Sequence, residues 1–122
     1  MADAIERSHI HDMDGARRAE VVSHGNLIFT SGIQPRSTDG DIKEQMRSAL
    51  ERLDAVLAEL GQSQESIFVI HVWLKDMRYF GAMNAVWNDW ADAENPPART
   101  CVSGELYRPD LLVELVVIAC RG

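Results

Sequence analysis

Apolar residues between Asp41 and Gly61 recur at steps of three and four, the spacing of one face of a helix. Asp41 followed by Glu44 resembles a capping box, and Gly61 stands where a helix commonly ends. The pattern predicts a helix over residues 41–61. Its apolar stripe consists of Ile42, Met46, Leu50, Leu53, Leu57 and Leu60.

Residues 76–93 show a second stripe with helical spacing and predict a second amphipathic helix. Asn95-Pro96-Pro97 follows it, and prolines do not continue a helix because they lack the backbone N–H. The stripe consists of Phe80, Met83, Val86 or Trp87, and Trp90.

Short runs of branched and aromatic residues predict five strands. Two lie within residues 19–33, on either side of the tight-turn sequence His24-Gly25-Asn26, and the others cover 66–74, 98–106 and 111–120. Residues 1–17 are expected to form an irregular arm and residues 34–41 a loop. The order β-β-α-β-α-β-β predicts one α+β domain over residues 18–122.

The segment from Leu111 to Ala119 is apolar at nearly every position, so both faces of this strand favour burial. Two helices can cover only one face of such a sheet, and the rest of the predicted elements leave the second face uncovered. A homo-oligomer that packs through this second face is therefore expected.

Composition limits the classes of function. The chain has 122 residues, 46% of them hydrophobic, enough for one buried core. Its net charge is −7 with scattered basic residues, which disfavours nucleic-acid binding. No apolar run is long enough to span a bilayer, and no signal segment opens the sequence, so we expect a cytoplasmic protein without a membrane partner. The two cysteines are expected to be reduced.

One carboxylate, Glu114, lies within the apolar strand, where an unpaired buried charge is costly. Arg99 begins the preceding strand, and alternation places Cys101 on the same face as Arg99. The sequence does not determine whether Arg99 and Glu114 share a face. If they do, the arginine fork could bind a substrate carboxylate, with a backbone N–H near Cys101 as a further donor, while Glu114 holds a water molecule. An ion pair that only satisfies both charges is the alternative.

Other reactive side chains lack the partners that their chemistry requires. Cys101 as a nucleophile would need a base, and neither His71 nor His24 lies in a motif that indicates this role. We expect a small cleft-lining or core residue at Cys101 and a hydrogen-bonded histidine at His71.

Two further patterns have ordinary structural explanations. His9-x-His11 with Asp12 has no additional ligand cluster, so no metal site is expected. Trp73, Trp87 and Trp90 could form a base-stacking platform, but their spacing favours core or interface positions.

Four blocks of the sequence resemble the Rid/YjgF family of reactive-intermediate (2-iminopropanoate) deaminases. They are "NLIFTSGIQP" (26–35), "VWLKDMRYFGAMNAVWNDW" (72–90), "PPARTCV" (96–102) and "VELVVIA" (113–119). The blocks occur in the family's order, and the resemblance extends over residues 18–120. The Ala-Arg-x-Cys block followed by the glutamate of the last strand is its most specific part.

The resemblance implies a chorismate-mutase-like α+β fold with two helices on one face of the sheet, assembled as a homotrimer with clefts between subunits. It implies hydrolysis of 2-imino acids or their enamine tautomers to 2-oxo acids and ammonia, with no metal or organic cofactor. The ligand would be a small imine or 2-oxo acid that carries a carboxylate. A non-catalytic trimer that binds a small metabolite, or acts as a holdase, is the alternative. The ribonuclease activity attributed to some relatives fits poorly with the net charge of −7.

The resemblance also assigns roles to residues. It implies that Arg99 binds the substrate carboxylate with help from the backbone of Cys101. It also implies that Glu114 is associated with the hydrolytic water molecule. The cleft-lining positions that match the family are Ser31, Gly32 and Asn84.

The first strand departs from the family pattern. Deaminase members commonly carry a tyrosine near the cleft, whereas this chain has Arg17 and Arg18 and no aromatic residue between Ala16 and Glu20. We expect Arg18 to be a solvated surface charge. A position near the cleft, where it would favour a more acidic ligand, is the alternative.

Overall fold

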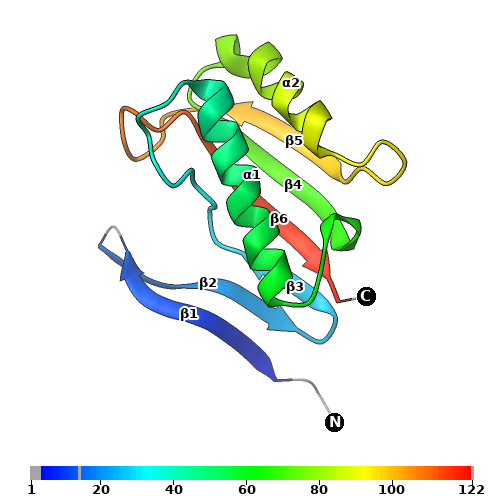
Figure 1. The fold of residues 1–122 in the computed structure, drawn as a ribbon. Coiled ribbons are helices and arrows are strands. Elements are labelled where there is room, and N and C mark those ends of the chain that lie inside the picture. The colour runs from blue at the N-terminus through cyan, green and yellow to red at the C-terminus, as the bar shows by residue number, and fades with distance from the viewer. Residues whose placement is uncertain (1–3, 14, 122) are drawn as a thin grey trace.

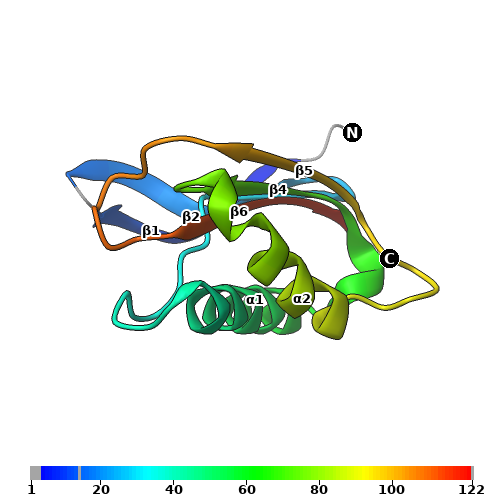
Figure 2. The same cartoon turned by 90° about the horizontal axis from the view of Figure 1, so that it is seen from above.

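The structure is a computed structural model that describes residues 4–13 and 15–121. In this part of the chain a six-stranded sheet carries two helices on one face (Figures 1 and 2). The expected α+β architecture is confirmed. The strands are β1 (Ile5–Met13), β2 (Ala16–His24), β3 (Leu27–Thr30), β4 (Ile67–Leu74), β5 (Ala98–Ser103) and β6 (Val113–Cys120), and the helices are α1 (Ile42–Glu59) and α2 (Phe80–Trp90).

The expected irregular arm over residues 1–17 is wrong wherever the structure describes a strand there. β1 pairs antiparallel with β2, from Ile5 opposite His24 to Met13 opposite Ala16. Asp14-Gly15 in the sequence is a dipeptide that favours two-residue hairpin turns, and Gly15 has the positive φ (77°) that such turns require. Polar residues conceal β1 in the sequence because an edge strand with solvated side chains needs no apolar alternation. Residues 1–3 and 14 lie outside the described residues.

The order of strands in the sheet is β1-β2-β3-β6-β4-β5, which places β6 near the centre and leaves β1 and β5 at the edges. β4 and β5 are parallel, and α2 forms the crossover between them, as a parallel pair requires. The other neighbouring strands are antiparallel.

Both helices bury most of their predicted apolar stripes, although Phe80 at the start of α2 is 38% exposed. The Asp41 carboxylate accepts a hydrogen bond from the Glu44 N–H at 2.9 Å, and Gly61 after the helix has a φ of 71°, so the predicted start and end of α1 are confirmed. In the second helical segment a 3₁₀ turn (Met77–Tyr79) precedes α2, and the side chain of Asp76 caps it at the Arg78 N–H.

The two faces of β6 lie in different surroundings. Its residues on the helix side are buried, namely Val113, Leu115, Val117 and Ala119, whereas the alternate residues are half-buried. On the second face Phe29 and Trp73 are 40% and 39% exposed. We call this side the open face. The described residues of one protomer thus leave the open face of the sheet without a covering layer, as predicted (Figure 2).

The cysteines and the helices bear on two further predictions. Both cysteines, Cys101 and Cys120, are free thiols, as predicted. Neither helix in the described ranges has the length and apolar character needed to cross a membrane.

Candidate functional site

Arg99 and Glu114 lie on opposite faces of the sheet. Arg99 pairs with Ile70, which is fully buried against the helices, and Glu114 pairs with Trp73 on the open face. Directly paired residues share a face, so the two side chains of one protomer point away from each other. The ion pair considered as an alternative does not form within a protomer. Each residue instead belongs to its own cluster, here called the arginine half-site and the glutamate half-site.

The arginine half-site consists of Arg99, Phe80, Met83, Asn84 and Trp87, between edge strand β5 and helix α2. The Arg99 guanidinium carbon lies 4.9 Å from the Trp87 ring centroid and 5.6 Å from that of Phe80. These are cation–π distances, and they hold a flexible cation in one place. The Arg99 Nη1 also lies 3.6 Å from the Met83 sulfur.

The half-site still has capacity to bind a ligand. Arg99 forms no ion pair with any described residue, and the weak acceptor at Met83 engages only one edge of its five-donor fork. Asn84 lies four residues after Phe80, on the same side of α2. Its Oδ1 is buried and has no hydrogen-bond partner among the described residues. A carboxylate bound to Arg99 would thus meet a cation whose charge no acidic residue of the described chain neutralises.

Cys101 shares a strand face with Arg99 and is partly buried against the core. Burial raises the pKa of the Cys101 thiol, and the nearby charge of Arg99 opposes this only in part. The thiol is therefore protonated at neutral pH and is a weak nucleophile. His71 cannot act as its base, because it lies on the open face, where its Nδ1 is 2.6 Å from the Thr100 hydroxyl oxygen. Cys101 is a cleft-lining or core side chain, as the sequence predicted.

The glutamate half-site consists of Glu114, Gly32 and Gln34. The Gln34 amide Nε2 donates a hydrogen bond of 2.8 Å to Glu114 Oε1. A Cβ atom on Gly32 would lie 2.4 Å from the same Oε1 and 2.6 Å from the carboxyl carbon. A side chain larger than hydrogen at residue 32 would therefore displace the carboxylate.

The backbone of residues 31–34 is attached to the sheet on both sides. The Ile33 N–H donates to the Leu115 carbonyl at 2.6 Å, and the Leu115 N–H donates to the Ile33 carbonyl at 2.9 Å. The Ser31 hydroxyl donates to the Ala19 carbonyl at 2.7 Å. Ser31 therefore attaches this segment to β2, and its hydroxyl is already engaged as a donor. These bonds hold Gly32 and Gln34 against Glu114.

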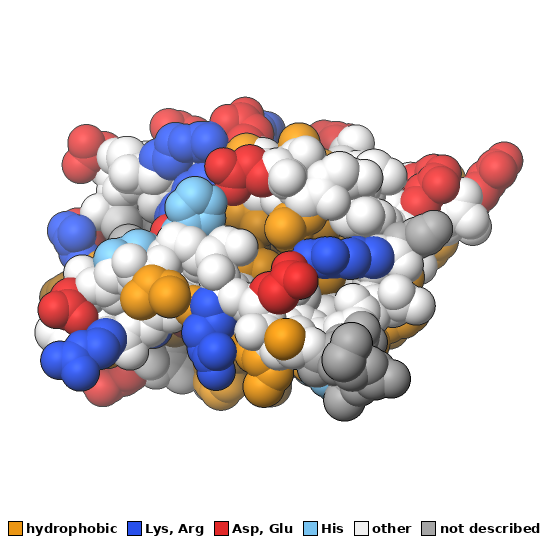
Figure 3. Space-filling view, turned by 90° about the horizontal axis from the view of Figure 1, so that it is seen from below, with side chains coloured by type: hydrophobic (Ala, Val, Ile, Leu, Met, Phe, Trp, Pro, Cys, Tyr) orange, Lys and Arg blue, Asp and Glu red, His pale blue; other side chains and the backbone are white. Residues whose placement is uncertain are grey.

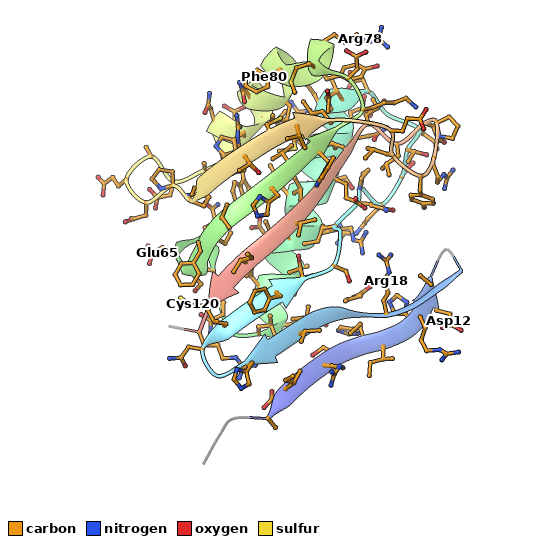
Figure 4. All side chains as sticks on the ribbon, turned by 180° about the vertical axis from the view of Figure 1, so that it is seen from behind. Asp12, Arg18, Glu65, Arg78, Phe80 and Cys120 are labelled. Atoms are coloured by element: carbon orange, nitrogen blue, oxygen red, sulfur yellow. The ribbon has the colours of Figure 1, made fainter. Side chains whose placement is uncertain are left out.

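A cavity of about 340 Å³ opens beside the Glu114 carboxylate, within the size range of small-ligand sites. Its lining includes Ala16, Arg18, Gln34, Trp73, Glu105, Tyr107 and Glu114. A smaller enclosed cavity of about 30 Å³ adjoins it at Arg18 and Gln34 and reaches Ser31 and Gly32. Figure 4 shows Arg18 extending from β2 on the side away from β1.

Sequence reasoning missed part of this lining. Arg18 is half-buried and lines both cavities, so the expectation of a solvated surface charge is wrong. Gln34 lies within the block "TSGIQP", yet its bond to Glu114 joins residues 80 positions apart, which no local pattern indicates. Trp73 and Tyr107 supply aromatic surface to the cavity, although residues 16–20 on β2 supply none.

The remaining candidate motifs form no second site. His9 Nε2 lies 3.0 Å from a Glu59 oxygen and His11 Nε2 lies 3.2 Å from a Glu20 oxygen, so the two histidines contact different partners. Residues 4–13 and 15–121 contain no group of three acidic, histidine or cysteine side chains placed to hold a metal ion. On the face shown in Figure 3 acidic and basic side chains are interspersed, without the basic stripe that a phosphate backbone requires.

The tryptophans do not form a common platform. Trp87 is buried in the core, and its ring centroid lies 5.6 Å from that of Trp90, whose Nε1 donates to Asp54 on α1. Trp73 lies on the open face of the sheet. Trp87 thus occupies a core position, one of the two kinds predicted for the tryptophans, and Trp90 is partly buried against that core.

Comparison with known proteins gives a consistent result. The family model described as "Endoribonuclease L-PSP" matches residues 16–121. A RutC family protein from Haemophilus influenzae is 33% identical over 108 residues, which cover 88% of this chain and 93% of the relative. The RutC family protein YoaB from Escherichia coli K12 is 36% identical over 104 residues, which cover 85% and 90% of the two chains.

Solved structures agree with the sequence relatives. A member of the YjgF protein family from Neisseria meningitidis superposes with a TM-score of 0.89 at 30% identity, covering 100% of this chain and 98% of the other. A Rid family protein of unknown function from Yersinia pestis gives a TM-score of 0.82 at 23% identity, covering 97% and 100% of the chains, which supports the fold alone.

Proposed function

The chain belongs to the YjgF/RutC/Rid family of endoribonuclease L-PSP domains, and we propose that it hydrolyses 2-imino acids, or their enamine tautomers, to 2-oxo acids and ammonia. The observation that carries the proposal is the glutamate half-site. There the Glu114 carboxylate is fixed by an amide and a glycine at the side of an open cavity, where it can act on a water molecule.

The proposed site requires more than one copy of the chain. A substrate that contacts both Arg99 and Glu114 cannot reach them within one protomer, because the sheet separates them. Arg99 lies on an edge strand and Glu114 lies on the uncovered open face, so both are accessible to a neighbouring copy. A homotrimer joined through the open face would bring an arginine half-site of one protomer to a glutamate half-site of the next.

Substrate binding would use the planar fork of Arg99. Two parallel N–H donors match the two oxygens of a carboxylate, and the rings of Phe80 and Trp87 keep the guanidinium in place. The arginine would also attract the substrate to a protein of net charge −7. Fixing the carboxylate leaves the adjacent C=N carbon in a defined position beside Glu114.

Hydrolysis would then proceed through successive proton transfers at Glu114. The carboxylate accepts a proton from water as the oxygen attacks the iminium carbon, which forms a C–O bond and moves the C=N π electrons to nitrogen. The proton passes to the amine of the resulting carbinolamine, the C–N bond breaks, and ammonia leaves. Glu114 takes the hydroxyl proton and passes it to the departing ammonia, which leaves as ammonium, so that a 2-oxo acid remains and the carboxylate is regenerated. Imines hydrolyse without a catalyst, so positioning and proton transfer suffice for acceleration.

A coupled assay tests the proposal. An amino-acid oxidase generates the imine, and release of the 2-oxo acid is followed with and without this protein. Acceleration is expected for the natural sequence, and Arg99→Lys should reduce kcat/KM by about tenfold or more because a point charge lacks the fork. Glu114→Gln should lower kcat while the protein still binds a 2-oxo acid. Arg78→Lys is a suitable control, since Arg78 is exposed and paired with Asp76 outside both half-sites.

The result distinguishes the enzyme from its alternative. A protein that binds 2-oxo acids but does not accelerate imine loss would be a metabolite-binding member of the family, and the deaminase proposal would be wrong. Full activity in Arg99→Lys and Glu114→Gln would contradict the assigned roles.

A further inference from the structure

We propose that Arg18 binds a second carboxylate of the substrate, so that the preferred substrates are 2-imino acids with an acidic side chain, as derived from aspartate or glutamate. This inference rests on the proposed deaminase function, because it concerns the same cavity. Nothing in the proposed chemistry itself requires a second cation, since Arg99 and Glu114 suffice for a substrate with one carboxylate.

The position of Arg18 supports this role. It is half-buried and lines the large cavity together with Glu114, and it also lines the small cavity behind Gly32. The neighbouring Arg17 lines neither cavity. Its side chain is 88% exposed, and its Nε lies 3.7 Å from Asp12, whose side chain is also exposed. Of the two consecutive arginines, Arg18 lines the large cavity, and Figure 4 shows its side chain on the side of β2 away from β1.

The lining of the large cavity contains two carboxylates, Glu114 and Glu105, and one basic residue, Arg18. Among these lining residues, a carboxylate on the ligand side chain could therefore meet a cation only at Arg18. Arg52 lines the small cavity and not the large one, and its Nη1 donates to the Gln34 carbonyl at 2.8 Å. Arg18 is the basic residue that lines the large cavity, and it therefore sets the charge that the substrate side chain meets.

The arrangement gives the two carboxylates of such a substrate separate positions. The carboxylate next to the C=N carbon would bind Arg99 of an adjacent protomer, and the reacting carbon would lie at Glu114. The side chain would then extend into the cavity that Glu114 shares with Arg18. Trp73 and Tyr107 line the same cavity and would contact the methylene groups of the side chain.

The experiment compares Arg18→Gln with Arg17→Gln, two variants with the same change in charge on adjacent residues. Imines are generated by oxidases from alanine and from glutamate, and kcat/KM is measured for each imine. The natural protein should prefer the glutamate-derived imine, and Arg18→Gln should reduce this preference by about tenfold or more, as expected for loss of a charge-assisted pair. Arg17→Gln should leave the preference unchanged, and Arg18→Lys should retain part of it. Equal losses for both imines in Arg18→Gln would overturn the inference, as would an unchanged preference.

A binding measurement separates this inference from the proposed activity. Calorimetry of the full-length protein with 2-oxoglutarate and with pyruvate should show tighter binding of 2-oxoglutarate, and Arg18→Gln should abolish the difference. If neither imine is hydrolysed but this pattern of binding holds, the deaminase proposal fails and the role of Arg18 stands. If the natural protein binds the two oxo acids equally, or binds neither, the role of Arg18 is wrong.

Discussion

The carboxylate of Glu114 occupies the position where a side chain on residue 32 would begin. An ideal Cβ on Gly32 would lie 2.4 Å from Glu114 Oε1, closer than real Cβ atoms approach an oxygen. The φ angle of Gly32 lies outside the left-handed region, so its backbone conformation is open to other residues. The requirement for glycine at this position therefore comes from the proximity of the carboxylate and not from the backbone.

Gly32→Ala should reduce activity by moving Glu114. The added methyl group pushes the carboxylate away from Gln34, and we expect kcat for imine hydrolysis to fall by about tenfold or more. The stability of the fold should fall by less than about 1 kcal/mol, because the atoms that must move belong to the end of a flexible side chain. The coupled oxidase assay measures the first effect, and urea denaturation measures the second.

Gly81→Ala provides the matched control. Gly81 lies on α2, and a Cβ there would meet nothing within 4 Å. Alanine has a higher helix propensity than glycine, and Gly81 lies in the first turn of α2, so this variant should gain up to about 0.5 kcal/mol and keep its activity. Undiminished hydrolysis by Gly32→Ala would show that the observed position of Glu114 does not matter for catalysis.

Cys101→Ala should retain activity within about threefold, because a protonated, partly buried thiol is not a nucleophile. The pKa of this thiol is raised above 9.0 in the folded state, so its contribution to stability is complete below the unfolded pKa and is lost as pH rises through the folded one. The natural protein should therefore lose stability more steeply above about pH 9 than Cys101→Ala does. Denaturant unfolding between neutral and alkaline pH measures the difference. Loss of hydrolysis in the alanine variant would instead indicate covalent chemistry at Cys101.

Elements with local sequence signals could be predicted, and α1 is the clearest example. Its apolar stripe, the Asp41 cap and the terminal Gly61 all lie within one continuous segment, so no distant contact was needed to locate them. The strand β6 was equally clear from its apolar run, and that run also indicated a sheet face that one protomer does not cover.

Features that depend on pairing between distant segments could not be predicted. The opposite orientation of Arg99 and Glu114 follows from the residues with which they pair on β4. The sequence of one strand does not determine its register against another, so this orientation could not be predicted. The support of Glu114 by Gln34 and the burial of Arg18 likewise depend on how the segment after β3 packs against β6 on one side and β2 on the other. The hairpin partner of β2 was missed for another reason, because polar residues dominate β1 and leave no apolar alternation to indicate a strand.

Ile118→Asp should separate the protomers and abolish hydrolysis. Ile118 is half-buried on the open face and pairs with Phe29 and Val69 across the neighbouring strands. A second copy packed on this face would have to bury the new charge without a partner, which is costly. Light scattering should show a trimer for the natural sequence and a monomer for the variant. Circular dichroism should show that the variant remains folded.

Lys43→Asp, a charge reversal at an exposed position of α1, is the control for Ile118→Asp. It should change neither the molar mass of the assembly in light scattering nor the activity. A natural protein that is monomeric in solution would contradict the proposed shared site. The same holds for an Ile118→Asp variant that remains trimeric and active, since its half-sites would then not depend on this face.

Asp54→Asn should make stability less dependent on pH between acidic and neutral conditions. Asp54 on α1 accepts a hydrogen bond from Trp90 Nε1 at 3.1 Å. Desolvation raises the pKa of the Asp54 carboxyl group above 3.8, and the nearby charge of Glu51 raises it further. The hydrogen bond from Trp90 lowers this pKa and so opposes the rise only in part. A raised folded pKa means that the stabilising contribution is present below the unfolded value and is lost as pH rises through the folded one. Asparagine keeps the hydrogen-bond acceptor without the charge. At neutral pH the free energy of unfolding of the variant should therefore equal that of the natural protein or exceed it by a few tenths of a kcal/mol, a difference kept small by the solvent exposure of residue 54. This advantage should shrink as pH is lowered toward about 4, and urea denaturation at both pH values measures it. Asp54→Ala also removes the hydrogen-bond acceptor and should be destabilised at neutral pH. If Asp54→Asn lost as much stability as Asp54→Ala, the ionised carboxylate would be favourable at this position and the prediction would be wrong.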